Sequence, residues 1–267
     1  MLDYQLTTFN NGLKLITAPL ENTKAVTVLF LIGVGSRYER KDQNGISHFL
    51  EHLFFKGTKK RPTTLDISKA LDAVGASYNA FTSEEHTGFY VHSASEHFDL
   101  ALDVLFDILY NSKFDASEIE REKGVISEEI NMYQDTPQAY IFEVAKKLFY
   151  AHQALGRPVA GEKEIIRKFT RKNFLEYRDC FYTPDNIIVA VAGDKNNFNW
   201  QEKVEDFFAK INFKKQGAYV KIREEQTKPA LAILEKKTDQ AHLVLAFRSL
   251  PRTNQRRPIA KVLSNLF

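Results

Sequence analysis

The stretch Gly45–Phe55, GISHFLEHLFF, decides how the rest of the chain is interpreted. Its apolar residues recur at the spacing of a helix with one broad buried face, and Gly57 predicts the helix end. Positions i and i+4 of a helix lie on one face, so the imidazoles of His48 and His52 can reach a single metal ion. Glu51 shares that face, where a carboxylate can take a proton from water during metal-assisted hydrolysis.

Two histidines do not complete a catalytic zinc site, which has three protein ligands and an open position. A later predicted helix, REKGVISEEINMY at residues 121–133, offers Glu122, Glu128 and Glu129. Glu122 and Glu129 are seven positions apart, which is two helical turns, so they share a face. Glu128 competes with Glu129, but adjacent helix positions point about 100° apart, so only one of them can face the metal.

The pattern H-x-x-E-H is the inverzincin signature, and here the chain resembles the N-terminal half of the pitrilysin-type (M16) zinc metallopeptidases. In that family the third ligand is a glutamate 75 to 80 residues after the second histidine, with another glutamate seven positions before it. Glu129 follows His52 by 77 residues and Glu122 precedes Glu129 by seven. The resemblance implies that His48, His52 and Glu129 bind Zn²⁺, that Glu51 activates the water, and that Glu122 orients a ligating imidazole.

The segment Tyr78–Thr82 resembles the family's exposed edge strand, which accepts an extended peptide by strand addition. This resemblance implies substrate binding by four residues: Asn79, Ala80, Phe81 and Thr82. An ordinary sheet strand, with Tyr78 and Phe81 packed in the core, is the alternative interpretation.

The function implied by the resemblance is zinc-dependent endopeptidase activity on extended peptides. Members of the family carry a second half with a Gly-rich loop followed by an Arg and Tyr pair, which this sequence lacks. We therefore expect a C-terminal half or a partner subunit to be needed for activity. A non-catalytic partner subunit or structural homologue is one alternative, and a zinc hydrolase of non-peptide substrates is another.

The remaining pattern predicts an α+β fold in which helices cover one face of a largely antiparallel mixed sheet. Residues 1–220 are expected to form the zinc-bearing domain, and residues 221–267 the beginning of a second, incomplete domain, after a polar linker at 214–229. Strands are expected at 13–19, 25–35, 77–82, 88–93, 187–192, 230–234 and 241–247. Helices are expected at 45–55, 65–74, 96–110, 115–133, 138–150, 171–181, 200–211 and from 258 onward.

Charge and composition indicate which partners and which cellular compartment to expect for this protein. The net charge is +3, with 37 basic and 34 acidic residues, so nothing demands nucleic acid. A lone cysteine, Cys180, cannot form an internal disulfide, and no signal or transmembrane segment is evident, so we expect a cytoplasmic protein without a membrane partner. The basic residues Lys56, Lys59, Lys60 and Arg61 are interpreted as a solvated helix exit. The five other histidines are given no role.

Overall fold

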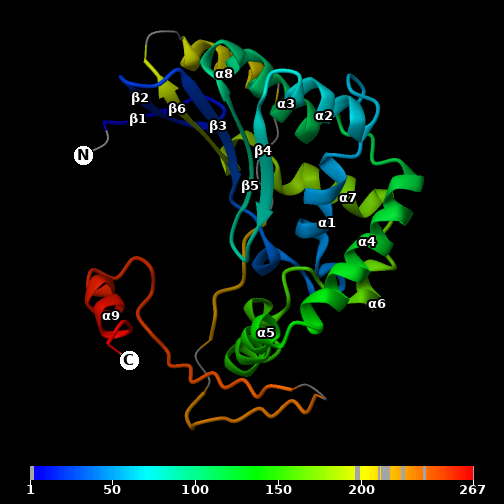
Figure 1. Cartoon of the computed structure of the whole chain (residues 1–267), viewed down its shortest axis with the longest axis vertical. Coiled ribbons are helices and arrows are strands. Elements are labelled where there is room, and N and C mark those ends of the chain that lie inside the picture. The colour runs from blue at the N-terminus through cyan, green and yellow to red at the C-terminus, as the bar shows by residue number, and fades with distance from the viewer. Residues whose placement is uncertain are drawn as a thin grey trace.

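A computed structural model describes residues 3–195, 199–209, 211, 217–223, 226–236 and 239–266. Six strands in this part of the chain form one sheet in the order β1-β2-β6-β3-β5-β4 (Figure 1). Their bounds are β1 Gln5–Thr8, β2 Lys14–Leu20, β3 Ala25–Ile32, β4 Ser77–Thr82, β5 Thr87–Ala94 and β6 Ile187–Asp194.

The sheet is mixed but largely antiparallel, as the sequence predicts. Only β2 and β6 pair in parallel, whereas β1–β2, β6–β3, β3–β5 and β5–β4 pair in antiparallel fashion. Although β2 and β3 follow one another in the chain, β6 lies between them. The order leaves β4 at one edge of the sheet, so one side of this strand has no neighbouring strand in the described structure.

Helices cover one face of this sheet (Figure 1). Every second side chain of β3 is buried while the others are half-buried, which is the pattern of a strand with one covered face. The α-helices are α1 Ile46–Phe54, α2 Thr64–Asp72, α3 Phe98–Asn111, α4 Ala116–Gln134, α5 Pro137–Tyr150, α6 Lys163–Ile166, α7 Arg171–Phe181, α8 Trp200–Phe208 and α9 Arg257–Leu263. Short 3₁₀ helices are η1 Ser36–Tyr38, η2 Lys41–Gln43, η3 Ser95–His97, η4 Ala154–Gly156 and η5 Pro184–Asn186.

Helix α1 lies in the centre of the core, between the sheet and the other helices. The ring of Phe54 is fully buried and lies 5.4 Å from that of Phe89 on β5, 5.7 Å from that of Phe114 and 5.2 Å from that of Tyr182, measured between centroids. Such edge-to-face and tilted aromatic contacts add to the free energy of burial. The sheet, the segment before α4 and the segment after α7 thus share one aromatic cluster around α1.

The strands expected at 230–234 and 241–247 are not formed. Within the described residues 226–236 and 239–250 the chain is extended but has no assigned strand, and Figure 1 draws it as coil beside α5. The apolar side chains there stay largely in solvent, with Leu231 at 79% and Phe247 at 85% exposure. The physical reason is that two isolated strands cannot bury a hydrophobic face, so sequence propensity alone does not produce a sheet.

Other helix ends differ slightly from expectation. Helix α8 ends at Phe208 rather than at Ile211, and Lys210 lies outside the described residues. The helix expected from residue 96 begins with η3 and continues as α3. Among the described residues, no helix combines the length and apolar character needed to cross a bilayer.

The position of Phe54 leads to a stability prediction. The substitution Phe54→Ala should lower the free energy of unfolding by about 3 to 5 kcal/mol, because it leaves a cavity inside the aromatic cluster. Urea denaturation followed by circular dichroism measures this change. Phe142→Ala is the matched control, because Phe142 is 64% exposed and its loss should change stability by less than about 0.5 kcal/mol. Equal effects of the two substitutions would contradict the central place of α1 in the core.

Candidate metal centre

Helix α1 begins at a point where the backbone is held tightly. Gly45 adopts a φ of +96°, and a Cβ atom there would come within 2.8 Å of the carbonyl oxygen of Ala160. The buried carboxylate of Glu39 accepts hydrogen bonds from the backbone N–H of Gly45 at 2.8 Å and of Ser47 at 3.0 Å. Burial raises the pKa of Glu39, although these hydrogen bonds oppose the shift. Asn44 donates to the carbonyl of Pro158 at 3.0 Å and Arg157 donates to that of Glu39 at 2.7 Å, so the start of the helix is held against residues 157–161.

One face of α1 enters the core and the opposite face carries the polar residues of the motif. The buried positions are Ile46, Ser47, Phe49, Leu50, Leu53 and Phe54. The side chains of His48 and His52 are 12% and 23% exposed and lie toward α4. Helical spacing brings the centroids of their rings to 4.8 Å from each other.

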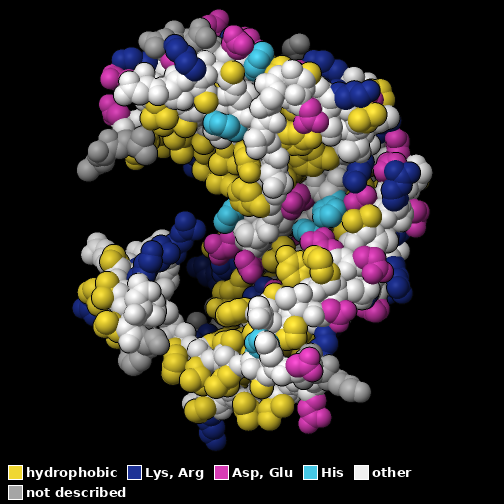
Figure 2. Space-filling model, viewed as in Figure 1, with side chains coloured by type: hydrophobic (Ala, Val, Ile, Leu, Met, Phe, Trp, Pro, Cys, Tyr) yellow, Lys and Arg dark blue, Asp and Glu magenta, His cyan; other side chains and the backbone are white. Residues whose placement is uncertain are grey.

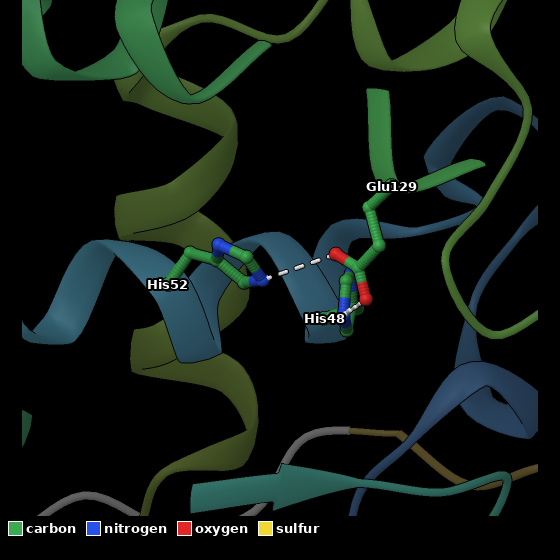
Figure 3. Close-up of side chains that lie close together, drawn as sticks. All are labelled: His48, His52 and Glu129. Atoms are coloured by element: carbon green, nitrogen blue, oxygen red, sulfur yellow. Dashed lines mark ion pairs between the residues drawn. The ribbon is translucent and has the colours of Figure 1, made fainter. Parts of the chain in front are cut away.

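Glu129 of α4 meets both histidines (Figure 3). Its Oε1 lies 3.6 Å from His48 Nε2, and its Oε2 lies 3.6 Å from His52 Nε2. Ligand atoms from the three residues all fall within 4.8 Å of one another. The neighbouring Glu128 instead accepts a hydrogen bond from Asn131 at 3.2 Å on the exposed side of α4.

The three side chains fit a tetrahedral zinc site in both distance and protonation. Ligands at about 2.0 to 2.2 Å from zinc lie about 3.3 to 3.6 Å from one another. Each oxygen of Glu129 lies 3.6 Å from one imidazole nitrogen, and the three ligand atoms as a set fall within 4.8 Å of one another. Burial, with a contribution from nearby His52, lowers the pKa of His48 to about 4, so its imidazole is neutral near pH 7. The contact between His48 and Glu129 is therefore not an ordinary ion pair, and a neutral imidazole is the form that binds metal.

A second glutamate of α4, Glu122, contacts His52 on the ring nitrogen opposite to the one that faces Glu129. The side chain of Glu122 is 1% exposed, and its Oε2 lies 3.0 Å from His52 Nδ1. Its Oε1 accepts a hydrogen bond from Lys56 Nζ at 2.7 Å. Burial opposes ionisation of Glu122, but the hydrogen bonds from His52 and Lys56 outweigh it, so its pKa is lowered. The ionised carboxylate can only accept, so His52 donates from Nδ1 and keeps the lone pair of Nε2 for a metal.

Glu51 occupies the same face and touches the edge strand. Thr82 at the end of β4 donates a hydrogen bond from Oγ1 to Glu51 Oε2 at 2.5 Å. Burial raises the pKa of Glu51, whereas the hydrogen bond from Thr82 lowers it in part. A carboxylate with a raised pKa beside a metal site is suited to accepting and returning a proton near neutral pH.

The four residues expected to contact substrate all lie on β4, the edge strand. The backbone N–H of Ala80 donates to the side-chain Oδ1 of its neighbour Asn79 at 2.8 Å, so this donor is not used in pairing with β5. Phe81 is 38% exposed, and Thr82 binds Glu51. The half-buried side chain of Tyr78 packs against the core, as the alternative interpretation holds for that residue.

A cleft of about 1040 Å³ runs past these groups and contains His48, Glu51, Phe81 and Glu129 in its wall. Figure 2 shows histidine and acidic side chains gathered in this hollow of the molecule. The opposite wall includes α5 and the segment 156–164, which the sequence analysis did not connect with the site. No motif in these segments signals a role, because only the fold brings them to face α1.

The interpretation of the basic cluster after α1 as solvated is wrong for two of its residues. Arg61 is buried and binds Asp107 at 2.8 Å and Asp103 at 2.5 Å, and Lys56 binds the buried Glu122. The physical reason is that acidic partners on α3 and α4, distant in sequence, compensate these charges. A run of basic residues gives no indication of such partners.

Two family models together match most of the chain, and they meet between residues 163 and 168, within the part that forms the first sheet and its helices. The family model described as Insulinase (Peptidase family M16) matches residues 14–163, and the model described as Peptidase M16 inactive domain matches residues 168–267. The chain is 36% identical over 259 residues to the uncharacterized zinc protease YmxG of Bacillus subtilis, covering 97% of this chain and 62% of that protein. It is 34% identical to the mitochondrial-processing peptidase subunit beta of Dictyostelium discoideum, covering 94% of this chain and 54% of that one.

Solved structures agree with these relatives. A protease from Helicobacter pylori superposes with a TM-score of 0.77 at 26% sequence identity, covering 84% of this chain and 54% of that one. The chain thus spans between about half and two thirds of the length of the relatives that it matches. From the matched family model, the fold and the sequence identity together, the chain belongs to the M16 family of peptidases.

Proposed function

We propose that this chain is the zinc-bearing part of a metalloendopeptidase that cleaves extended peptides. The observation that carries the proposal is the convergence of His48, His52 and Glu129, whose ligand atoms lie within 4.8 Å of one another, beside the half-buried carboxylate of Glu51. Membership of a peptidase family and the zinc protease relatives support the same chemistry.

In the proposed mechanism, His48, His52 and Glu129 would hold zinc. The metal would polarise the scissile carbonyl and lower the pKa of the attacking water. Glu51 takes the proton from this water and then delivers it to the leaving amine. Thr82 holds the Glu51 carboxylate in place through its hydrogen bond. Glu122 orients His52 from the other side.

We propose that the substrate peptide adds to β4 as a further strand. An extended peptide can pair with the open edge of β4, including the N–H of Ala80, once the side chain of Asn79 moves aside. Because Thr82 connects the same strand to Glu51, a peptide bound there lies in register with the general base. Phe81 and α5 line the cleft through which the peptide would run.

A partner half is part of this proposal. The relatives are longer than this chain, and one of them is described as a subunit. We propose that a C-terminal half or a partner subunit completes the cleft, that residues 221–267 begin that second domain, and that the protein works in the cytoplasm. A purely non-catalytic role is less consistent with the assembled set of His48, Glu51, His52 and Glu129.

The first test of the proposal is zinc binding. The chain should bind one Zn²⁺, and Glu129→Gln should weaken binding by at least about 10-fold because a charged ligand is lost. Competition with a chromogenic chelator measures the affinity. Glu128→Gln is the matched control and should bind like the parent chain, because Glu128 points toward Asn131. Absence of zinc binding by the parent chain would rule out the proposal.

The second test concerns the general base. In the protein completed by its second half, Glu51→Gln should retain zinc and reduce peptide cleavage by about 10²- to 10⁴-fold, because the proton acceptor is removed. Zinc content and the cleavage rate of a quenched fluorescent peptide are measured on the same sample. Glu96→Gln serves as control, because Glu96 lies on the exposed surface and is 77% accessible. Cleavage that persists in Glu51→Gln rejects the assignment.

The third test concerns strand addition. Ala80→Pro should weaken peptide binding by about 5- to 10-fold, because it removes a donor worth about 1 kcal/mol from the open edge of β4. The fold should tolerate it, since proline is accepted where an edge-strand N–H does not pair within the sheet. Fluorescence anisotropy of a labelled peptide, measured in the Glu51→Gln background, reports affinity without cleavage. Unchanged affinity would place the peptide elsewhere.

A further inference from the structure

We propose that Lys56 is a positioning residue for the metal centre, acting through Glu122 on His52. This inference rests on the zinc site proposed above and adds a residue that follows α1 rather than lying in its metal-binding motif. In the described part of the chain, the side chain of Lys56 pairs with Glu122 and makes no ion pair with any of the three proposed metal ligands. Its effect is transmitted by the carboxylate that stands between it and the imidazole.

Glu122 lies buried between Lys56 and His52. Its side chain is 1% exposed, and each oxygen has a defined partner: Lys56 Nζ at 2.7 Å from Oε1 and His52 Nδ1 at 3.0 Å from Oε2. A buried carboxylate without a compensating cation is strongly unfavourable. Lys56 supplies the only cation that the structure places on Glu122 in the described part of the chain, apart from the imidazole of His52.

The contact between Lys56 and Glu122 favours the tautomer of His52 that carries its hydrogen on Nδ1. The ammonium group of Lys56 only donates, and it lies on Oε1 while Oε2 faces His52 Nδ1. The cation also keeps the carboxylate ionised, so that Oε2 accepts from His52. With the hydrogen on Nδ1, the lone pair of His52 lies on Nε2, which is the atom 3.6 Å from Glu129. Displacement of the carboxylate would free the imidazole to turn or to carry its hydrogen on Nε2, and that tautomer cannot bind metal through Nε2, the nitrogen that faces Glu129.

The backbone around Lys56 is held in place by the loop that follows α1. Gly57 adopts a φ of +121°, and a Cβ atom there would come within 2.3 Å of the carbonyl oxygen of Pro62. The carbonyl of Gly57 accepts from the N–H of Lys113 at 3.1 Å, and Thr58 donates to buried Asp107 at 2.6 Å. The loop after α1 is thus fixed to α3, and the lysine side chain reaches α4 from a defined position.

The positive charge of Lys56 and its positioning role have opposite effects on the affinity for zinc. Removing a cation near the site would, by charge alone, strengthen the binding of Zn²⁺. Loss of the support for His52 would weaken it. Because these two effects have opposite signs, weaker zinc binding after removal of Lys56 identifies positioning as the dominant role.

The experiment uses the chain in its zinc-free and zinc-bound forms. Multiple-bond ¹H–¹⁵N correlation spectra of the zinc-free chain report the tautomer of His52, which should change from Nδ1–H in the parent chain to a mixture in Lys56→Met. Chelator competition should show zinc affinity lowered by about 10- to 100-fold in Lys56→Met. Lys56→Arg should restore both readouts, because a cationic donor again reaches Glu122.

Two controls make the result specific. Lys60→Met removes a lysine of the same loop that binds Asp103 at 2.6 Å on the surface, and it should leave both readouts unchanged. In a Glu122→Gln background, Lys56→Met should cause little further loss, because the connecting carboxylate is already absent. Circular dichroism verifies that each variant is folded.

The inference is overturned if Lys56→Met leaves the His52 tautomer unchanged, if it leaves zinc affinity equal or higher, or if its effect is as large in the Glu122→Gln background. Failure of the parent chain to bind zinc is a different outcome. That result would remove the proposed endopeptidase, whereas the tautomer of His52 in the zinc-free chain would still test the link from Lys56 through Glu122.

Discussion

The rest of the structure depends on how α1 is packed. This helix lies between the sheet on one side and α4 on the other. One face of α1 must be buried against the aromatic cluster around Phe54, and this fixes the rotation of the helix about its axis. The polar face is thereby directed at α4, where Glu122 and Glu129 lie two turns apart. Because interiors are close-packed, the helix cannot rotate to another position without loss of that packing.

Buried charges hold both ends of the same helix. At the N-terminus, the carboxylate of Glu39 accepts from the first N–H groups of α1. Beyond the C-terminus, Arg61 is bound to Asp103 and Asp107, and Lys56 is bound to Glu122. Buried ionic groups add little net stability when compared with apolar packing, but each fully partnered group permits only one arrangement. In this protein that arrangement determines where the two imidazoles point.

The C-terminal part of the chain contrasts with this well-packed region. Apolar residues such as Leu243 and Phe247 are at least 80% exposed, and the segments that carry them have no sheet to join within the described structure. The family model of the second domain nevertheless matches residues 168–267, and part of that match, β6, completes the first sheet. The boundary between the two family models therefore does not coincide with the boundary of the folded sheet, because β6 belongs to the second match and to the first sheet.

The sequence by itself determined the local chemistry of this protein. Helical periodicity places His48, Glu51 and His52 on one face whatever surrounds the helix, and a spacing of seven does the same for Glu122 and Glu129. Segments rich in Tyr, Phe, Thr and Val likewise predicted β4 and β5, because these residue types favour the pleated strand. Spacing and the family resemblance favoured Glu129 over Glu128, and the orientation of α4 shows that Glu129 is the one that meets both histidines.

Only the tertiary structure decided which distant groups meet. It inserted β6 between β2 and β3, placed α5 across the cleft and gave Lys56 a buried partner 66 residues away. It also left residues 230–234 and 241–247 without strand structure despite their propensity. The physical reason is the same in each case. The pairing of strands and the cost of an uncompensated buried charge depend on neighbours in space, and local sequence does not specify those neighbours.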